Sequence, residues 1–155
     1  MMRLFKLILL SIVAIQCQGC FSSEKCSPVA HAFVKLPLRE QLAQFGSLSL
    51  PEQYDVYLCG TQVVHPPLIH LAQPFAKDGK AAVEFLQSKL EGANDDSTIR
   101  DIVMVFTEMQ RQGTYDVAKD PALMQTIRAS TSRVKDSGWR QFVTQRVGEI
   151  TGSSR

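Results

Sequence analysis

The sequence predicts an all-α fold, either an irregular helical bundle or a short array of helix pairs, after an N-terminal leader. Apolar residues recur at helical spacing in several stretches of the second half of the 155-residue chain. Asp or Ser caps precede these stretches, and glycines follow several of them. Strand signals are weak, because no long alternating run and no Asn-Gly hairpin between apolar runs is present.

The first twenty residues have the pattern of a secretory signal peptide. Arg3 and Lys6 form a positive start, and an apolar run follows over residues 7–15. This run is far shorter than the roughly 20 residues that a membrane-crossing helix needs. We therefore expect a signal peptide over residues 1–19 and no permanent membrane span there.

The end of this leader resembles the lipobox of bacterial lipoproteins. In that motif a Leu, a small residue and Gly or Ala precede the lipidated Cys; here Gly19 and Cys20 fit, while Cys17 stands at the usual Leu position. The resemblance implies a diacylglycerol thioether and an N-acyl chain on Cys20, with the lipid bilayer as a binding partner. Because Phe21 is not Asp, it also implies the outer membrane rather than the inner. Ordinary signal-peptidase cleavage after Gly19 is the alternative.

The number of cysteines is consistent with lipidation. Cleavage before Cys20 removes Cys17 and leaves Cys20, Cys26 and Cys59. If Cys20 carries lipid, Cys26 and Cys59 can form a structural disulfide in an oxidising compartment, worth roughly 3–4 kcal/mol. A redox pair is the other interpretation, but the chain has no Cys-x-x-Cys motif.

Composition argues against several kinds of partner. Without the leader, residues 20–155 contain 15 Lys and Arg and 15 Asp and Glu, so the mature chain is formally neutral. A neutral domain is poor evidence for nucleic acid binding or for a polybasic membrane surface.

We expect a tether over 20–35, one helical domain over 36–150 and a flexible tail over 151–155.

Helix signals in the first part of that domain are local. Ser49 and Glu52 have capping-box spacing with Pro51 between them, which predicts a helix over about 50–59 that stops near Gly60. The dipeptide Pro66-Pro67 then breaks the chain, and a short helix is expected from there to about residue 75.

The second part is more regular. Asp78 is the expected cap of a helix over 79–91, and Asp96 or Ser97 the expected cap of a helix that ends at residue 112. Asp120 before a proline predicts a helix to about 134, and Asp136 or Ser137 opens a last helix through about 147.

One stretch resembles the helix pairs of HEAT repeats. In residues 81–109 a helix with spaced leucines is followed by an Asp-containing turn and the aliphatic-Arg pair Ile99-Arg100. The helices over 121–134 and 137–150 are a candidate second pair. The resemblance implies a protein-binding array and makes Arg100 a candidate interface residue. The irregular bundle remains the alternative.

Two further sets of residues are candidates for function. His65 and His70 with Asp95, Asp96 and Asp101 would serve a small envelope hydrolase or a metal-binding protein, if they meet in one pocket. Against this, the two histidines are five apart with prolines between them, which is not metal-ligand spacing on one helix face. Trp139 is either a core anchor of the last helix or an exposed interface residue.

The function expected from these observations is protein binding in the bacterial cell envelope. No Gly-x-Ser-x-Gly, Walker or Gly-x-Gly-x-x-Gly motif is present, and we expect no cofactor. The leading interpretation is a lipid-anchored helical domain that binds or scaffolds another envelope protein, rather than an enzyme. It predicts an exposed apolar or aromatic patch on a helix face.

Overall fold

The computed structural model describes residues 26–153, so the leader, Cys20 and the first part of the expected tether lie outside it. Within this range the chain forms eight α-helices, three short 3-10 turns and no strand, which confirms the all-α prediction. No helix among these residues is long and apolar enough to cross a membrane. The helices are α1 (Pro28–Phe33), α2 (Leu38–Gln44), α3 (Leu50–Gln62), α4 (Ala72–Ala76), α5 (Lys80–Gly92), α6 (Asp96–Gln112), α7 (Pro121–Arg133) and α8 (Ser137–Thr151). The 3-10 turns are η1 (Phe45–Ser47), η2 (Ile69–Leu71) and η3 (Val117–Lys119).

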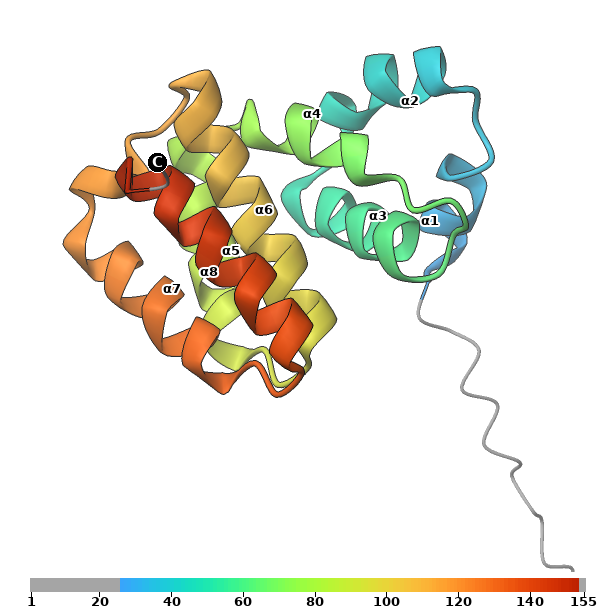
Figure 1. The fold of residues 1–155 in the computed structure, drawn as a ribbon. Coiled ribbons are helices and arrows are strands. Elements are labelled where there is room, and N and C mark those ends of the chain that lie inside the picture. The colour runs from blue at the N-terminus through green and yellow to red at the C-terminus, as the bar shows by residue number, and fades with distance from the viewer. Residues whose placement is uncertain (1–25, 154–155) are drawn as a thin grey trace, which may run out of the picture.

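The helices form two groups, with α1–α4 on one side of the molecule and α5–α8 on the other (Figure 1). In the second group α6 packs on α8 and α5 packs on α7, so the pair α5–α6 stacks on the pair α7–α8. In the first group the helices are short and α3 packs mainly on α1. The whole is an irregular helical bundle, and α6 joins its two halves through contacts with both α3 and α4.

The fold begins earlier than the sequence predicted. Ser27 accepts a hydrogen bond from the Ala30 amide at 3.1 Å and caps α1, whose Phe33 is buried. The sulfur atoms of Cys26 and Cys59 lie 2.13 Å apart in a disulfide that joins the start of α1 to α3. The disulfide prediction is confirmed, but residues 26–35 belong to the packed domain rather than to a tether.

Most helix starts follow the predicted caps, with two corrections. Asp120 and Asp136 cap α7 and α8 as predicted. The cap of α6 is Asp95, which accepts from the Thr98 amide at 2.8 Å, and not Asp96 or Ser97. Asp78 does not cap α5: Gly79 stands at that position with φ +50°, a left-handed conformation that favours glycine.

Two helix ends also differ from the prediction. Helix α3 continues past Gly60 to Gln62, because Gly60 serves close packing instead of helix termination: a Cβ there would lie 3.1 Å from the Leu68 side chain. Helix α8 continues to Thr151 and ends at Gly152, which has φ +71°.

The core of the first half is aromatic. Phe45 contacts both Phe33 and Phe75 with ring centroids 5.9 and 5.7 Å apart, and Tyr57 meets Phe75 edge-on. Helix α6 packs against both halves of the molecule, and its Val105 and Phe106 side chains are fully buried. Met104, on the same helix, is only half-buried and faces the boundary between the two halves.

Candidate functional site

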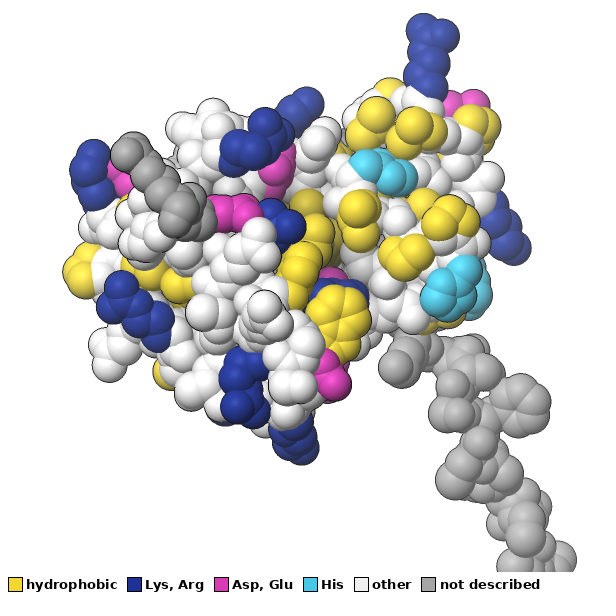
Figure 2. Space-filling view, viewed as in Figure 1, with side chains coloured by type: hydrophobic (Ala, Val, Ile, Leu, Met, Phe, Trp, Pro, Cys, Tyr) yellow, Lys and Arg dark blue, Asp and Glu magenta, His cyan; other side chains and the backbone are white. Residues whose placement is uncertain are grey.

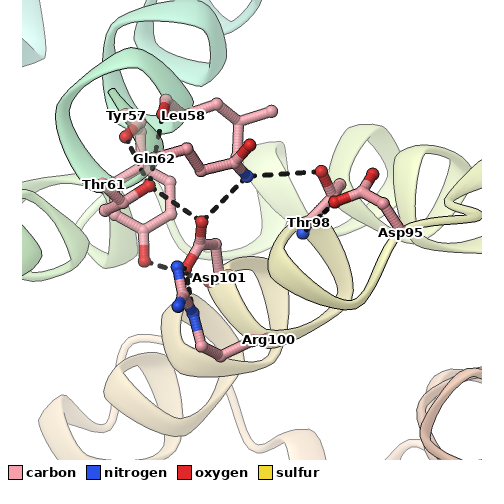
Figure 3. A network of polar contacts seen from close by, with 8 residues as sticks. All are labelled: Tyr57, Leu58, Thr61, Gln62, Asp95, Thr98, Arg100 and Asp101. Carbon is pink, nitrogen blue, oxygen red and sulfur yellow. Dashed lines mark hydrogen bonds and ion pairs between the residues drawn. The ribbon is translucent and has the colours of Figure 1, made fainter. Parts of the chain in front are cut away.

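A buried carboxylate joins the two halves of the molecule. Asp101 on α6 is 1% exposed, and its Oδ2 atom accepts hydrogen bonds from Thr61 Oγ1 at 2.8 Å and Gln62 Nε2 at 3.0 Å (Figure 3). Both donors lie in the last turn of α3. On the other side, Arg100 places Nε and Nη2 at 2.7 and 2.6 Å from Oδ1. Each carboxylate oxygen therefore has two donors.

A tyrosine completes this network. The hydroxyl of Tyr57 donates to the main-chain carbonyl of Asp101 at 3.0 Å and is fully buried. Burial raises the pKa of the Tyr57 phenol well above its ordinary value, so the group keeps the proton that it donates. Burial also raises the pKa of Asp101, and the Arg100 guanidinium opposes that rise. The network thus fixes α3 against α6 and orients Arg100.

Arg100 also connects the buried network to an exposed aromatic side chain. Its guanidinium lies over the ring of Trp139 on α8, 4.4 Å from the centroid. Trp139 meets Phe142 edge-on at 6.0 Å, and Arg146 lies over Phe142 at 4.8 Å. These four side chains form a row in which the two aromatic rings lie between two arginines. Each cation–aromatic contact contributes about 0.5–1 kcal/mol at exposed positions.

This row runs beside a cleft between the two halves. The cleft has a volume of about 330 Å³ and is lined on one side by Ile69 of η2 and on the other by Met104 of α6 and Arg146 of α8. The charged groups at the cleft are paired: Arg146 with Glu149 at 2.7 Å, and Arg111 with Glu108.

We call five residues together the seam surface: Ile69, Met104 and Arg146 line the cleft between the two halves, and Trp139 and Phe142 continue from Arg146 along α8. Figure 2 shows hydrophobic side chains gathered along this boundary and over the face of the first half. Trp139 is 39% exposed and Ile69 is 57% exposed.

The two histidines have separate surroundings. His70 lines the cleft, and its Nε2 atom lies 3.0 Å from Gln41 Oε1. The Gln41 amide nitrogen already donates to two backbone carbonyls, so the Gln41 oxygen is the acceptor and His70 is the donor. Burial lowers the pKa of His70, which favours the neutral ring. His65 is exposed in the loop after α3.

The acidic residues are likewise not assembled with the histidines. Asp95 caps α6, and Asp101 is held in the buried network. Asp96 accepts backbone hydrogen bonds from Lys135 and Asp136, the latter at 2.8 Å, and so holds the loop between α7 and α8. Over residues 26–153, no group of three His, Cys, Asp or Glu side chains could hold a metal ion.

Trp139 was a candidate interface residue in the sequence, but Phe142 and Arg146 beside it were not. Trp139, Phe142 and Arg146 have i, i+3, i+7 spacing on one helix, which places them on one face. That spacing can be read from the sequence, but the contact of Trp139 with Arg100 on another helix cannot. Thr61 and Gln62 carried no local signal, since their roles depend on α6 packing against α3.

Comparisons of the chain with family models, with curated proteins and with solved structures found no match.

Proposed function

We propose that this protein is a lipid-anchored envelope protein whose helical domain binds another protein at the seam surface. The leader pattern and Cys20 support the anchor. The disulfide between Cys26 and Cys59 is consistent with it, because these two cysteines use each other and neither needs Cys20 as a partner. A binding role rather than catalysis is proposed for the domain.

The observation that carries the binding role is the exposure of Trp139 within an ordered row. Tryptophan and arginine are the residues most enriched at binding hot spots. Here Arg100 covers one face of the Trp139 ring and Phe142 lies against it. Since the ring is already held, a partner would lose little entropy in ordering it.

The adjacent cleft extends this surface. Ile69 and Met104 provide apolar walls, and the pair formed by Arg146 and Glu149 lies at the rim. This arrangement, with an apolar centre and charged pairs at the edge, is the usual composition of a protein interface. We therefore expect the partner to place an apolar side chain in the cleft and to cover Trp139.

The test is co-purification from membranes of tagged protein after cross-linking in cells. The Trp139→Ala variant should lose the cross-linked partner that the unchanged protein retains. Val29→Ala is the matched control, because Val29 is an apolar residue of α1 that is 44% exposed and lies outside the seam surface. Equal recovery of the partner with both variants would reject the seam surface as the binding site.

Folding must be checked in the same experiment. Trp139→Ala removes a surface ring and its contact with Arg100, but leaves the buried network of Asp101 in place. We expect both variants to keep the helical circular dichroism signal of the unchanged protein. A Trp139→Phe variant keeps an aromatic ring at the site and should recover part of the binding.

A further inference from the structure

The loop that follows α3 is apolar and largely exposed. It comprises residues 63–68, between the end of α3 and the start of η2. Val63 is 41% exposed, and His65, Pro66 and Pro67 are exposed as well. Residues 56–76 contain no Lys, Arg, Asp or Glu, so neither the loop nor the segments on either side of it carry an acidic or strongly basic side chain.

This composition differs from that of the loops in the second half. The loops that follow α4, α5, α6 and α7 each contain an aspartate, namely Asp78, Asp95, Asp116 and Asp136. Contact with an apolar medium is costly for a charged group and favourable for an apolar one. The loop after α3 therefore has the composition of a contact surface, whereas the other four have the composition of loops that face water.

Both ends of the loop are fixed to the same turn of α3. The amides of Val63 and Val64 donate to the Cys59 carbonyl at 3.0 and 3.3 Å. At the other end the Leu68 amide donates to the Gly60 carbonyl at 2.9 Å, and the Leu68 side chain packs against Gly60. The loop therefore folds back on the end of α3 and leaves the residues between its two ends on the outside.

This turn of α3 also holds the chain that leads to the anchor. Cys59 is bonded to Cys26, and their Cα atoms lie 5.2 Å apart. Cys26 follows Cys20 by six residues, which span at most about 20 Å when they are extended. With Cys20 lipidated as proposed above, the loop is attached to the part of the domain that the anchor holds near the lipid surface.

Helix α2 adds apolar side chains beside this loop. The segment η2, which directly follows the loop, contacts α2 through the hydrogen bond between His70 and Gln41. Leu38 and Leu42 lie about one turn apart on α2 and are 56% and 45% exposed. Figure 2 shows hydrophobic and histidine side chains together on the first half, with charged side chains mainly at its edge.

We propose that the loop over residues 63–68 lies on the lipid surface to which Cys20 anchors the protein. This inference rests on the proposed lipid anchor, and it adds which face of the domain the anchor turns towards the membrane. A contact of this kind buries apolar side chains in the boundary between headgroups and acyl chains. Ile69 of the seam surface directly follows the loop, so the proposed partner site lies next to the proposed lipid contact.

The experiment uses protein extracted from membranes and placed in nanodiscs of phosphatidylethanolamine and phosphatidylglycerol. Its intact mass is recorded first. A small share of the lipid carries a nitroxide on its acyl chain, which weakens the NMR signals of nearby methyl groups. The Val63 methyl signals should lose at least half of their intensity. The methyl group of Ala129, which is exposed on α7 in the other half, should keep most of its intensity.

Variants test whether the loop itself makes the contact. Pro67→Glu places a negative charge in the exposed part of the loop and should at least halve the loss of Val63 intensity. Ala129→Glu is the matched control and should leave that loss unchanged. Val63→Glu, followed at the Val64 methyl groups, gives the same test with both prolines in place. The methyl signals of buried Val56 report whether each variant keeps the fold.

The two readouts separate this inference from the anchor. If the mass shows acyl chains but Val63 is weakened no more than Ala129, the lipid contact is overturned and the anchor stands. Loop variants that behave like Ala129→Glu would also overturn the contact. A mass without acyl chains would reject the anchor. In that case, selective weakening of Val63 by the same nanodiscs would still support the contact, and its absence would overturn both.

Discussion

The hydroxyl of Thr61 lies 2.8 Å from the carboxylate of Asp101, although forty residues separate them in the chain. This contact joins the end of α3 to the first half of α6. It also completes the set of donors that keeps a charged group inside the protein, since Arg100 occupies the other oxygen of Asp101.

The first prediction concerns this network. Asp101→Asn should lower the free energy of unfolding by about 3 kcal/mol, because it leaves the Arg100 guanidinium without its counter-charge and puts an amide donor among other donors. Urea unfolding followed by circular dichroism measures the change. Asp116→Asn removes an exposed pair with Lys119 and should have little effect. A comparable loss in both variants would mean that the buried network of Asp101 stabilises the fold no more than the exposed pair of Asp116 and Lys119.

The second prediction concerns the disulfide. The Cys26→Ser, Cys59→Ser double variant should lose about 3–4 kcal/mol of stability, because the bond closes a loop with a sequence separation of 33 residues. Thermal unfolding with and without reductant provides the measurement. Reductant should destabilise the unchanged protein and have no effect on the double variant. An unchanged protein that is insensitive to reductant, although its thiols are shown to be free, would contradict this.

The third prediction concerns acid stability. Backbone hydrogen bonds from Asp136 and Lys135 hold the pKa of Asp96 below its ordinary value of 3.8. The folded state therefore favours the ionised form. The contribution of the Asp96 carboxylate to the stability of the fold is present above pH 3.8. It is lost as the pH falls through the lower pKa that Asp96 has in the folded state.

Asp96→Asn can be compared with the unchanged protein to isolate this contribution. The amide oxygen can still accept the two backbone hydrogen bonds, but it does not titrate. Stability measured by urea unfolding from pH 5 to pH 2.5 should fall less steeply in the variant. Parallel curves over this range would show that Asp96 has the same pKa in the folded and unfolded states.

The fourth prediction concerns the anchor. The intact mass of protein extracted from membranes should correspond to a chain that begins at Cys20 and carries diacylglycerol. Reduction should add the mass of two hydrogens, from the disulfide between Cys26 and Cys59. An unlipidated chain that begins at Cys20 would reject the lipoprotein assignment and would favour ordinary cleavage after Gly19.

Local signals accounted for what the sequence predicted well. Asp120 with the following proline, and Asp136, mark helix starts through contacts within three residues, and both are confirmed as caps. Gly60 shows the limit of such signals. A glycine can end a helix or allow close packing, and the second role depends on Leu68, which approaches it only in the folded chain.

The features that the sequence did not predict depend on contacts between residues that lie far apart in the chain. The sequence predicts a tether over 20–35, yet Phe33 is buried against Phe45 and holds α1 in the fold. The function of Asp101 depends on residues of α3. Residues 121–153 contain five Lys and Arg and only two Asp and Glu, but a count over the whole mature chain averaged them with the more acidic remainder.

If Cys20 carries lipid as proposed, the disulfide at Cys26 limits the distance between the domain and the membrane. It fixes the chain to α3 only six residues after Cys20, and six extended residues span at most about 20 Å. With Cys20 lipidated as proposed, this short linker keeps the domain within about one domain diameter of the lipid surface. Its partner must then either be embedded in the same membrane or approach that surface closely, which excludes proteins that stay in the middle of a wide compartment.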